Sequence, residues 1–147
     1  MTDKIKFKGT GRVTLTHDDG RVEVYEQHNM IVNSGFNIII SSLISSERPA
    51  QLSHVAIGTG TTATSETQTT LVAEKYRKAG TWTWASGSKK FSIKADWDRG
   101  AVLGTITEGG VFNAATGGSM FDRLVFETPF TGAADTKFSM EFEFEVM

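Results

Sequence analysis

Cysteine is absent from this chain of 147 residues, and proline occurs only twice. The lack of cysteine excludes disulfide bonds, thiolate metal sites and cysteine nucleophiles. The fold must therefore depend mainly on burial of apolar surface, and a chain of this length buries roughly 70% of the surface that it exposes when unfolded. The sequence shows no linker and no internal repeat, so we expect a single β-rich domain over residues 1–147.

An excess of charge of one sign is also lacking, because 15 basic residues nearly balance 17 acidic ones, for a net charge of −2. Nucleic-acid-binding domains usually have a basic excess, so we expect no nucleic-acid partner. Long hydrophobic runs are missing as well. The most apolar stretch, residues 36–44, is interrupted by Asn37, Ser41 and Ser42. It is shorter than the roughly 18 residues of a membrane span, so we expect no membrane insertion.

What the chain does have is alternation of apolar and polar residues between its 15 glycines. A period of two predicts a strand with one buried face. The longest such segment is C-terminal, and its apolar positions are Phe138, Met140, Phe142, Phe144 and Val146. We therefore expect this segment to be a core strand.

The N-terminal segment, residues 5–27, has the same alternation and predicts a hairpin. Its turn is expected at Asp18-Asp19-Gly20, because glycine tolerates the positive φ that tight turns require. On the returning strand, Val22 and Val24 are expected on the buried face.

Helical spacing is found only over residues 34–45, where Phe36, Ile39, Ile40 and Leu43 recur every three or four positions. Asn33 and Ser34 precede this run and are residue types that cap helix N-termini. Residues 58–70 consist almost entirely of Gly, Thr, Ser and Ala and predict an exposed loop. Residues 71–78 fit either a short helical turn or a strand.

Together these segments give about eight or nine strands and one helix. We therefore predict a mainly β fold, either a β-sandwich or a partly closed barrel, in which the helix covers one end or one face.

No pattern in the chain predicts a catalytic, cofactor-binding or metal-binding site. The histidines at positions 17, 28 and 54 lack the spacing of metal ligands. Gly58-Thr59-Gly60 follows an apolar segment, but no P-loop lysine accompanies it. We therefore expect neither enzymatic activity nor a cofactor.

Four charged residues, Glu74, Arg77, Glu108 and Arg123, lie among apolar residues or glycines. Carboxylates near an arginine occur in active sites, but they more often form a buried or interfacial ion pair. We predict that Glu108 and Arg123 are paired structural charges, with Glu74 and Arg77 as further candidate partners.

The tryptophans at positions 82, 84 and 97 all fall on alternating segments. Such aromatic residues pack in a core or a subunit interface, or they form a flat platform on which a sugar ring stacks. The sequence leaves packing and glycan binding open for Trp82, Trp84 and Trp97, with packing favoured.

Four short motifs occur along most of the chain. They read N-x-I-V-N-x-G at residues 29–35, A-I-G-x-G at 56–60, L-x-x-E-x-x-R at 71–77 and E-x-G-x-F-N at 108–113. Together they resemble a family of small tailed-bacteriophage virion proteins, usually described only as phage structural or tail proteins. The chain departs from the family pattern at Met30, where leucine is usual, and at Val111, where leucine or isoleucine is common.

The resemblance implies a virion structural protein that assembles symmetrically with copies of itself and with other virion proteins. The expected position is the tail, the baseplate or the neck/collar, after synthesis in the cytoplasm of the bacterial host. Two alternatives stay open. One is a carbohydrate-binding module that contacts a surface glycan on the receptor, and the other is a capsid decoration protein.

Overall fold

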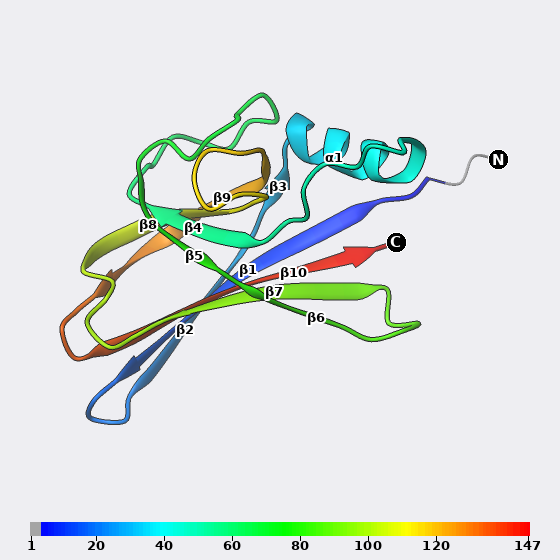
Figure 1. Cartoon of the computed structure of the whole chain (residues 1–147). Coiled ribbons are helices and arrows are strands. Elements are labelled where there is room, and N and C mark those ends of the chain that lie inside the picture. Colours follow the sequence, from blue (N-terminus) through cyan, green and yellow to red (C-terminus); the bar gives the residue numbers. More distant parts are fainter. Residues whose placement is uncertain (1–3) are drawn as a thin grey trace.

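The computed structural model describes residues 4–147 and contains ten strands and one helix within them (Figure 1). In chain order these are β1 (Phe7–His17), β2 (Val22–His28), β3 (Met30–Ile31), α1 (Asn33–Ile44), β4 (His54–Gly58), β5 (Glu74–Ala79), β6 (Thr81–Trp84), β7 (Lys90–Trp97), β8 (Gly104–Phe112), β9 (Met120–Gly132) and β10 (Thr136–Val146). The fold is mainly β, as the alternation predicted.

The strands form two antiparallel five-stranded sheets. Sheet A has the order β2-β1-β10-β7-β6, and sheet B has the order β3-β9-β8-β4-β5. The sheets remain separate and do not close on each other, so the architecture is a β-sandwich. Apolar side chains of the two facing surfaces fill the space between them, as sandwiches require.

The chain passes directly from one sheet to the other at two corners. Asn29 separates β2 of sheet A from β3 of sheet B, and its N–H donates to the carbonyl of Gly9 at 3.2 Å. Gly80 separates β5 of sheet B from β6 of sheet A, and its N–H donates to the carbonyl of Ser53 at 2.9 Å. Because these strands lie at the sheet edges, the corners join the two sheets along both sides of the sandwich.

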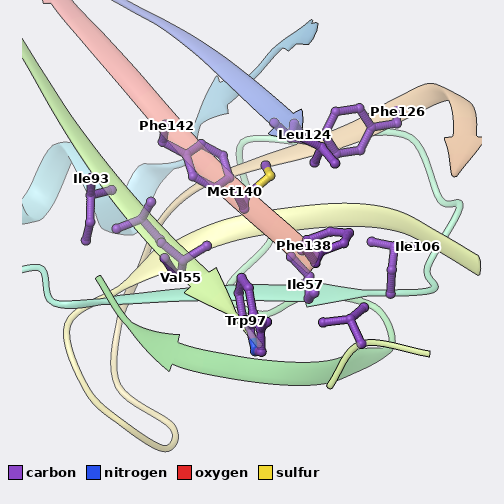
Figure 2. Close-up of a cluster of buried hydrophobic side chains, with 14 of the residues drawn as sticks. Val55, Ile57, Ile93, Trp97, Ile106, Leu124, Phe126, Phe138, Met140 and Phe142 are labelled. Carbon is purple, nitrogen blue, oxygen red and sulfur yellow. The ribbon is translucent and has the colours of Figure 1, made fainter. Parts of the chain in front are cut away.

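The main core lies between the sheets, and β10 provides its centre. Phe138, Met140, Phe142 and Phe144 are at most 1% exposed, as their alternation predicted, whereas Val146 at the end of the strand is only half-buried. Figure 2 shows Phe138, Met140 and Phe142 among side chains of sheet B such as Ile57 and Leu124. Strand β10 pairs with β1 on one side and with β7 on the other, so it is the middle strand of sheet A.

Helix α1 was predicted over residues 34–45 and is found at Asn33–Ile44, but its N-terminus differs from the expectation. Val32 occupies the N-cap position, and no side chain caps the helix there. The hydroxyl of Ser34 instead donates to the carbonyl of Met120 at 2.5 Å. The cap is therefore replaced by a contact that attaches the first turn to β9. No helix in residues 4–147 is both long and apolar enough to cross a membrane.

The predicted hairpin is present, but the faces of β2 are the reverse of the prediction. Val22 and Val24 are 58% and 53% exposed, and Tyr25 packs against the core instead. The turn sets this register, because it places Val24 opposite Thr14, on the outer face of β1. A shift of one residue would invert every side chain of the strand, so the turn decides which face is buried.

Candidate functional site

A second, smaller core covers the face of sheet B that is turned away from sheet A, called the outer face below. Its apolar members are Val32, Ala56, Leu71, Phe112 and Met120. In Figure 1 the loop between β4 and β5 and the loop between β8 and β9 lie on this side of sheet B. The motifs noted in the sequence converge here, and this is the candidate site.

Glu108 on β8 and Arg123 on β9 form an ion pair at the centre of the outer face. Nε of Arg123 donates to Oε1 of Glu108 at 3.0 Å, and both side chains are fully buried. The pairing of Arg123 with Gly110 and of Glu108 with Val125 makes the two charged residues diagonal neighbours on adjacent strands. A Cβ atom at Gly110 would overlap the carbonyl oxygen of Asp122, so only glycine fits on β8 opposite Arg123.

Three backbone N–H groups also donate to the Glu108 carboxylate. They belong to Gly60 at 2.6 Å, Val72 at 2.9 Å and Ala73 at 2.8 Å. With the Arg123 bond, each carboxylate oxygen accepts two hydrogen bonds, which fills the capacity of an ionised carboxylate. The side chain therefore holds both ends of the 59–73 loop, and no lone pair remains for a general base.

Arg123 holds the middle of the same loop. Its Nη1 donates to the carbonyl of Thr62 at 2.7 Å and to Oε1 of Gln68 at 3.2 Å. Its Nη2 is buried and has no hydrogen-bond partner among residues 4–147. Most of the loop is exposed, as its composition predicted, but buried charges fasten it at both ends and in the middle. We call this arrangement the clamp: Glu108, Arg123 and the 59–73 loop that they hold.

The glycines of the A-I-G-x-G motif are required by the clamp. A Cβ atom at Gly60 would overlap Oε2 of Glu108, and one at Gly58 would overlap the carbonyl of Ala73. The carboxylate can reach the loop N–H groups only because these two residues lack a side chain. This motif and the glutamate of the E-x-G-x-F-N motif are thus two parts of one contact.

Glu74 and Arg77 form a second ion pair, and the segment that contains them is a strand. Oε1 of Glu74 lies 2.6 Å from Nη2 of Arg77. Residues three apart in a regular strand face opposite sides, but β5 has a register irregularity opposite Ile57 and Gly58. The irregularity acts as a bulge that adds one residue, so both charges lie on the outer face.

Arg77 fastens the other loop of the outer face. Its Nη1 donates to the carbonyls of Ala114 at 3.0 Å and Gly117 at 2.8 Å. Its guanidinium lies 3.8 Å from the centre of the Phe112 ring, within the range of a cation–π contact. Arg77 and Arg123 therefore act alike, since each holds one loop by its carbonyls and is neutralised by one glutamate.

Sequence reasoning missed a further polar pair, which joins the buried Asp122 to the half-buried Asn29. Nδ2 of Asn29 donates to Oδ2 of Asp122, and the N–H of Val111 donates to Oδ1 at 2.9 Å. Asp122 is fully buried, and this burial raises the pKa of its carboxyl to about 7. Two features of the sequence could have revealed this pair: an aspartate within the apolar segment of β9, and the asparagine that begins the first motif.

The three tryptophans do not share one surface. Trp97 belongs to the main core, 7% exposed, and packs edge-on against Phe138 at 5.7 Å between ring centres. Trp82 is half-buried, and its Nε1 donates to the carbonyl of Leu52 at 2.6 Å. Trp84 is 69% exposed. Only Trp84 therefore presents most of its ring to solvent, whereas Trp97 is a packing residue.

The contacts of the clamp are those of a structural ion pair. Its carboxylate is saturated, both charged groups are closed off from solvent, and no titratable partner among residues 4–147 hydrogen-bonds Glu108 except Arg123. Within residues 4–147, no three His, Cys, Asp or Glu side chains come close enough to hold a metal ion.

Comparison of the chain with protein-family models, with curated proteins and with solved structures found no match.

Proposed function

We propose that this protein is a bacteriophage virion structural protein that assembles symmetrically in the tail, baseplate or neck/collar region. The four sequence motifs resemble those of phage virion proteins, and one structural observation gives this function its main support. Three of the four motifs meet on the outer face of sheet B, and there they build the clamp and the Arg77 contact. The first motif holds β9 through Asn29.

Residues that recur together in a catalytic family should surround a cavity that admits substrate. Here they hold loops against a sheet, and the central pair of Glu108 and Arg123 is closed to solvent, as a rigid building block requires. A protein that is repeated in an assembly benefits from loops of defined shape, because each copy must present the same surface to its neighbours.

The exposed apolar residues of α1 give a second, independent support for assembly. Leu43 and Ile44 are 79% and 80% exposed. Large apolar side chains grouped on a surface usually mark an interaction site.

The carbohydrate-binding alternative depends on aromatic rings open to solvent. Trp84 meets that condition, but Trp97 lies in the core. A sugar-binding site on β6 would therefore have a single open ring and its half-buried neighbour Trp82.

The deciding experiment measures mass and glycan affinity on the same purified protein. Native mass spectrometry and negative-stain imaging should show closed oligomers of one defined copy number, and a glycan screen should show no saturable binding. A monomer that binds a glycan, with affinity lost in Trp84→Ala, would replace the virion-structural proposal with the receptor-contact one. Val24→Ala is the matched control, because Val24 is also an exposed residue on an edge strand.

A further inference from the structure

Helix α1 presents an apolar stripe to solvent. Phe36, Ile40 and Ile44 are spaced four apart, and Leu43 lies beside them, so the four side chains share one side of the helix. They are 43%, 51%, 80% and 79% exposed in that order. The helix contains no Asp, Glu, Lys or Arg at all. We call these four residues the stripe.

The stripe is large for a monomer surface. From the exposed fractions, it presents on the order of 450 Å² of apolar area, and the largest apolar patch of a typical monomer is about 300–600 Å² and often functional. Each partner in a standard protein–protein interface buries about 800 Å². The stripe could therefore supply about half of one side of such an interface.

An apolar groove lies on the opposite side of the same helix. It has a volume of about 330 Å³ and runs between α1, the 49–52 segment and the β6–β7 hairpin. Its apolar lining includes Ile38, Pro49, Leu52, Trp82 and Phe91, and none of its lining residues is charged. Helical residues two apart point in nearly opposite directions, so Ile38 faces away from Phe36 and Ile40.

We propose that the stripe of one copy seats in this groove of the next copy, so that copies join head to tail. This inference rests on the proposed function and names the surfaces through which the copies would assemble. A contact between two different surfaces of the same chain repeats from copy to copy, and it closes into a ring when the rotation permits.

Size and charge favour a second copy as the occupant. Since one water molecule takes about 30 Å³, a groove of about 330 Å³ has room for a few aliphatic side chains such as Leu43 and Ile44. Neither surface has a charge, so self-association creates no like-charge contact and needs no oppositely charged partner. A partner recognised through its charge would need charged residues to contact, and neither the stripe nor the groove has any.

The test uses one substitution on each surface. Leu43→Glu puts a charge on the stripe, and Ala50→Arg fills the groove from an exposed lining position. Each variant alone should self-associate at least tenfold more weakly than the unaltered chain in sedimentation velocity. Val24→Glu changes an exposed valine away from both surfaces and should assemble normally. Circular dichroism checks that all variants fold.

An equimolar mixture of the two variants gives the sharpest result. Leu43→Glu retains an intact groove and Ala50→Arg retains an intact stripe, so the mixture should form one-to-one heterodimers that go no further. If only the stripe variant loses assembly, copies pair stripe to stripe without using the groove, and the proposal is overturned.

Two other outcomes separate this inference from the proposed function. If both variants assemble like the unaltered chain, these surfaces are wrong, but self-assembly stands. If the unaltered chain stays monomeric at every concentration, head-to-tail joining is refuted and the symmetric assembly in the proposed function fails with it.

Discussion

At the scale of single residues, buried charges organise the outer face of sheet B. Glu108 is fully buried, yet each of its oxygens accepts two hydrogen bonds. A buried charge is tolerated only when such partners replace its hydration. Removing one partner leaves the other charge uncompensated, so substitutions of Glu108 and Arg123 should be severe and coupled.

We predict that Glu108→Gln and Arg123→Met each lower the stability by about 3–5 kcal/mol. For a chain of this length, that corresponds to a fall in melting temperature of roughly 6–20 °C. In Glu108→Gln, the NH₂ group of the introduced amide would face backbone N–H groups that need an acceptor. The double variant should be little worse than either single one, because both lose the same contact.

The matched control for this prediction is Arg12→Met, because Arg12 pairs with Glu26 at the surface with both side chains about half exposed. Such pairs contribute about 0–1 kcal/mol. If Glu108→Gln melts no earlier than Arg12→Met, the buried pair does not stabilise the fold.

Because Asp122 is buried, we expect the stability of the fold to depend on pH. Its pKa is raised to about 7 in the folded protein, above the value of 3.8 expected for an aspartate in the unfolded chain. Between these values the folded state binds one more proton than the unfolded state. The stabilisation is therefore complete below pH 3.8 and is lost as the pH rises through 7.

We predict that stability falls by on the order of 2–3 kcal/mol between about pH 5 and pH 8 because of this group. Asp122→Asn cannot ionise, so the loss should be absent in that variant. Urea unfolding at both pH values measures the difference. Parallel pH profiles for the two proteins would show that Asp122 ionises freely despite its burial.

At the scale of elements, the 59–73 loop shows how polar anchors replace apolar burial. Its large apolar residues are Leu71 and Val72, and only Leu71 is buried, at 5% exposed against 51% for Val72. Order comes instead from the contacts with Glu108 and Arg123, and from the bond of the Asn33 N–H to the carbonyl of Glu66 at 2.8 Å. We therefore expect the loop to detach from sheet B when the Glu108 carboxylate is displaced.

We predict that Gly60→Ala speeds cleavage after Glu66 by a glutamate-specific protease roughly tenfold. The added methyl group overlaps Oε2 of Glu108, and the displaced hydrogen bonds are worth about 1–3 kcal/mol. Mass spectrometry of a digestion time course measures the rate. Thr61→Ala is the control at an exposed neighbour. Equal rates for the two variants would mean that the clamp does not order the loop.

At the scale of the whole molecule, the sandwich depends on the strand that comes last in the chain. Strand β10 joins β1 to β7, so without it sheet A separates into two hairpins. Its four fully buried apolar side chains contribute roughly 6–12 kcal/mol in gross terms, comparable to the net stability of about 5–15 kcal/mol of a typical domain.

We predict that deletion of residues 137–147 gives insoluble protein. The expected result is loss of the chain from the soluble fraction and, for any soluble remainder, loss of the near-ultraviolet circular dichroism of packed aromatic rings. A soluble truncation that unfolds cooperatively would show that the rest of the sandwich closes without β10.

The sequence by itself determined most of the strands, the helix and the core positions of β10, because period and side-chain type act locally. It also singled out Glu108 and Arg123, since a charge amid apolar residues needs a partner. Tertiary structure alone decided which strands share a sheet, because hydrogen bonds between distant strands do not alter the spacing of residues within each strand. It likewise decided the reversed faces of β2, through the register of a turn, and the role of Asp122, because its partner Asn29 lies 93 positions away.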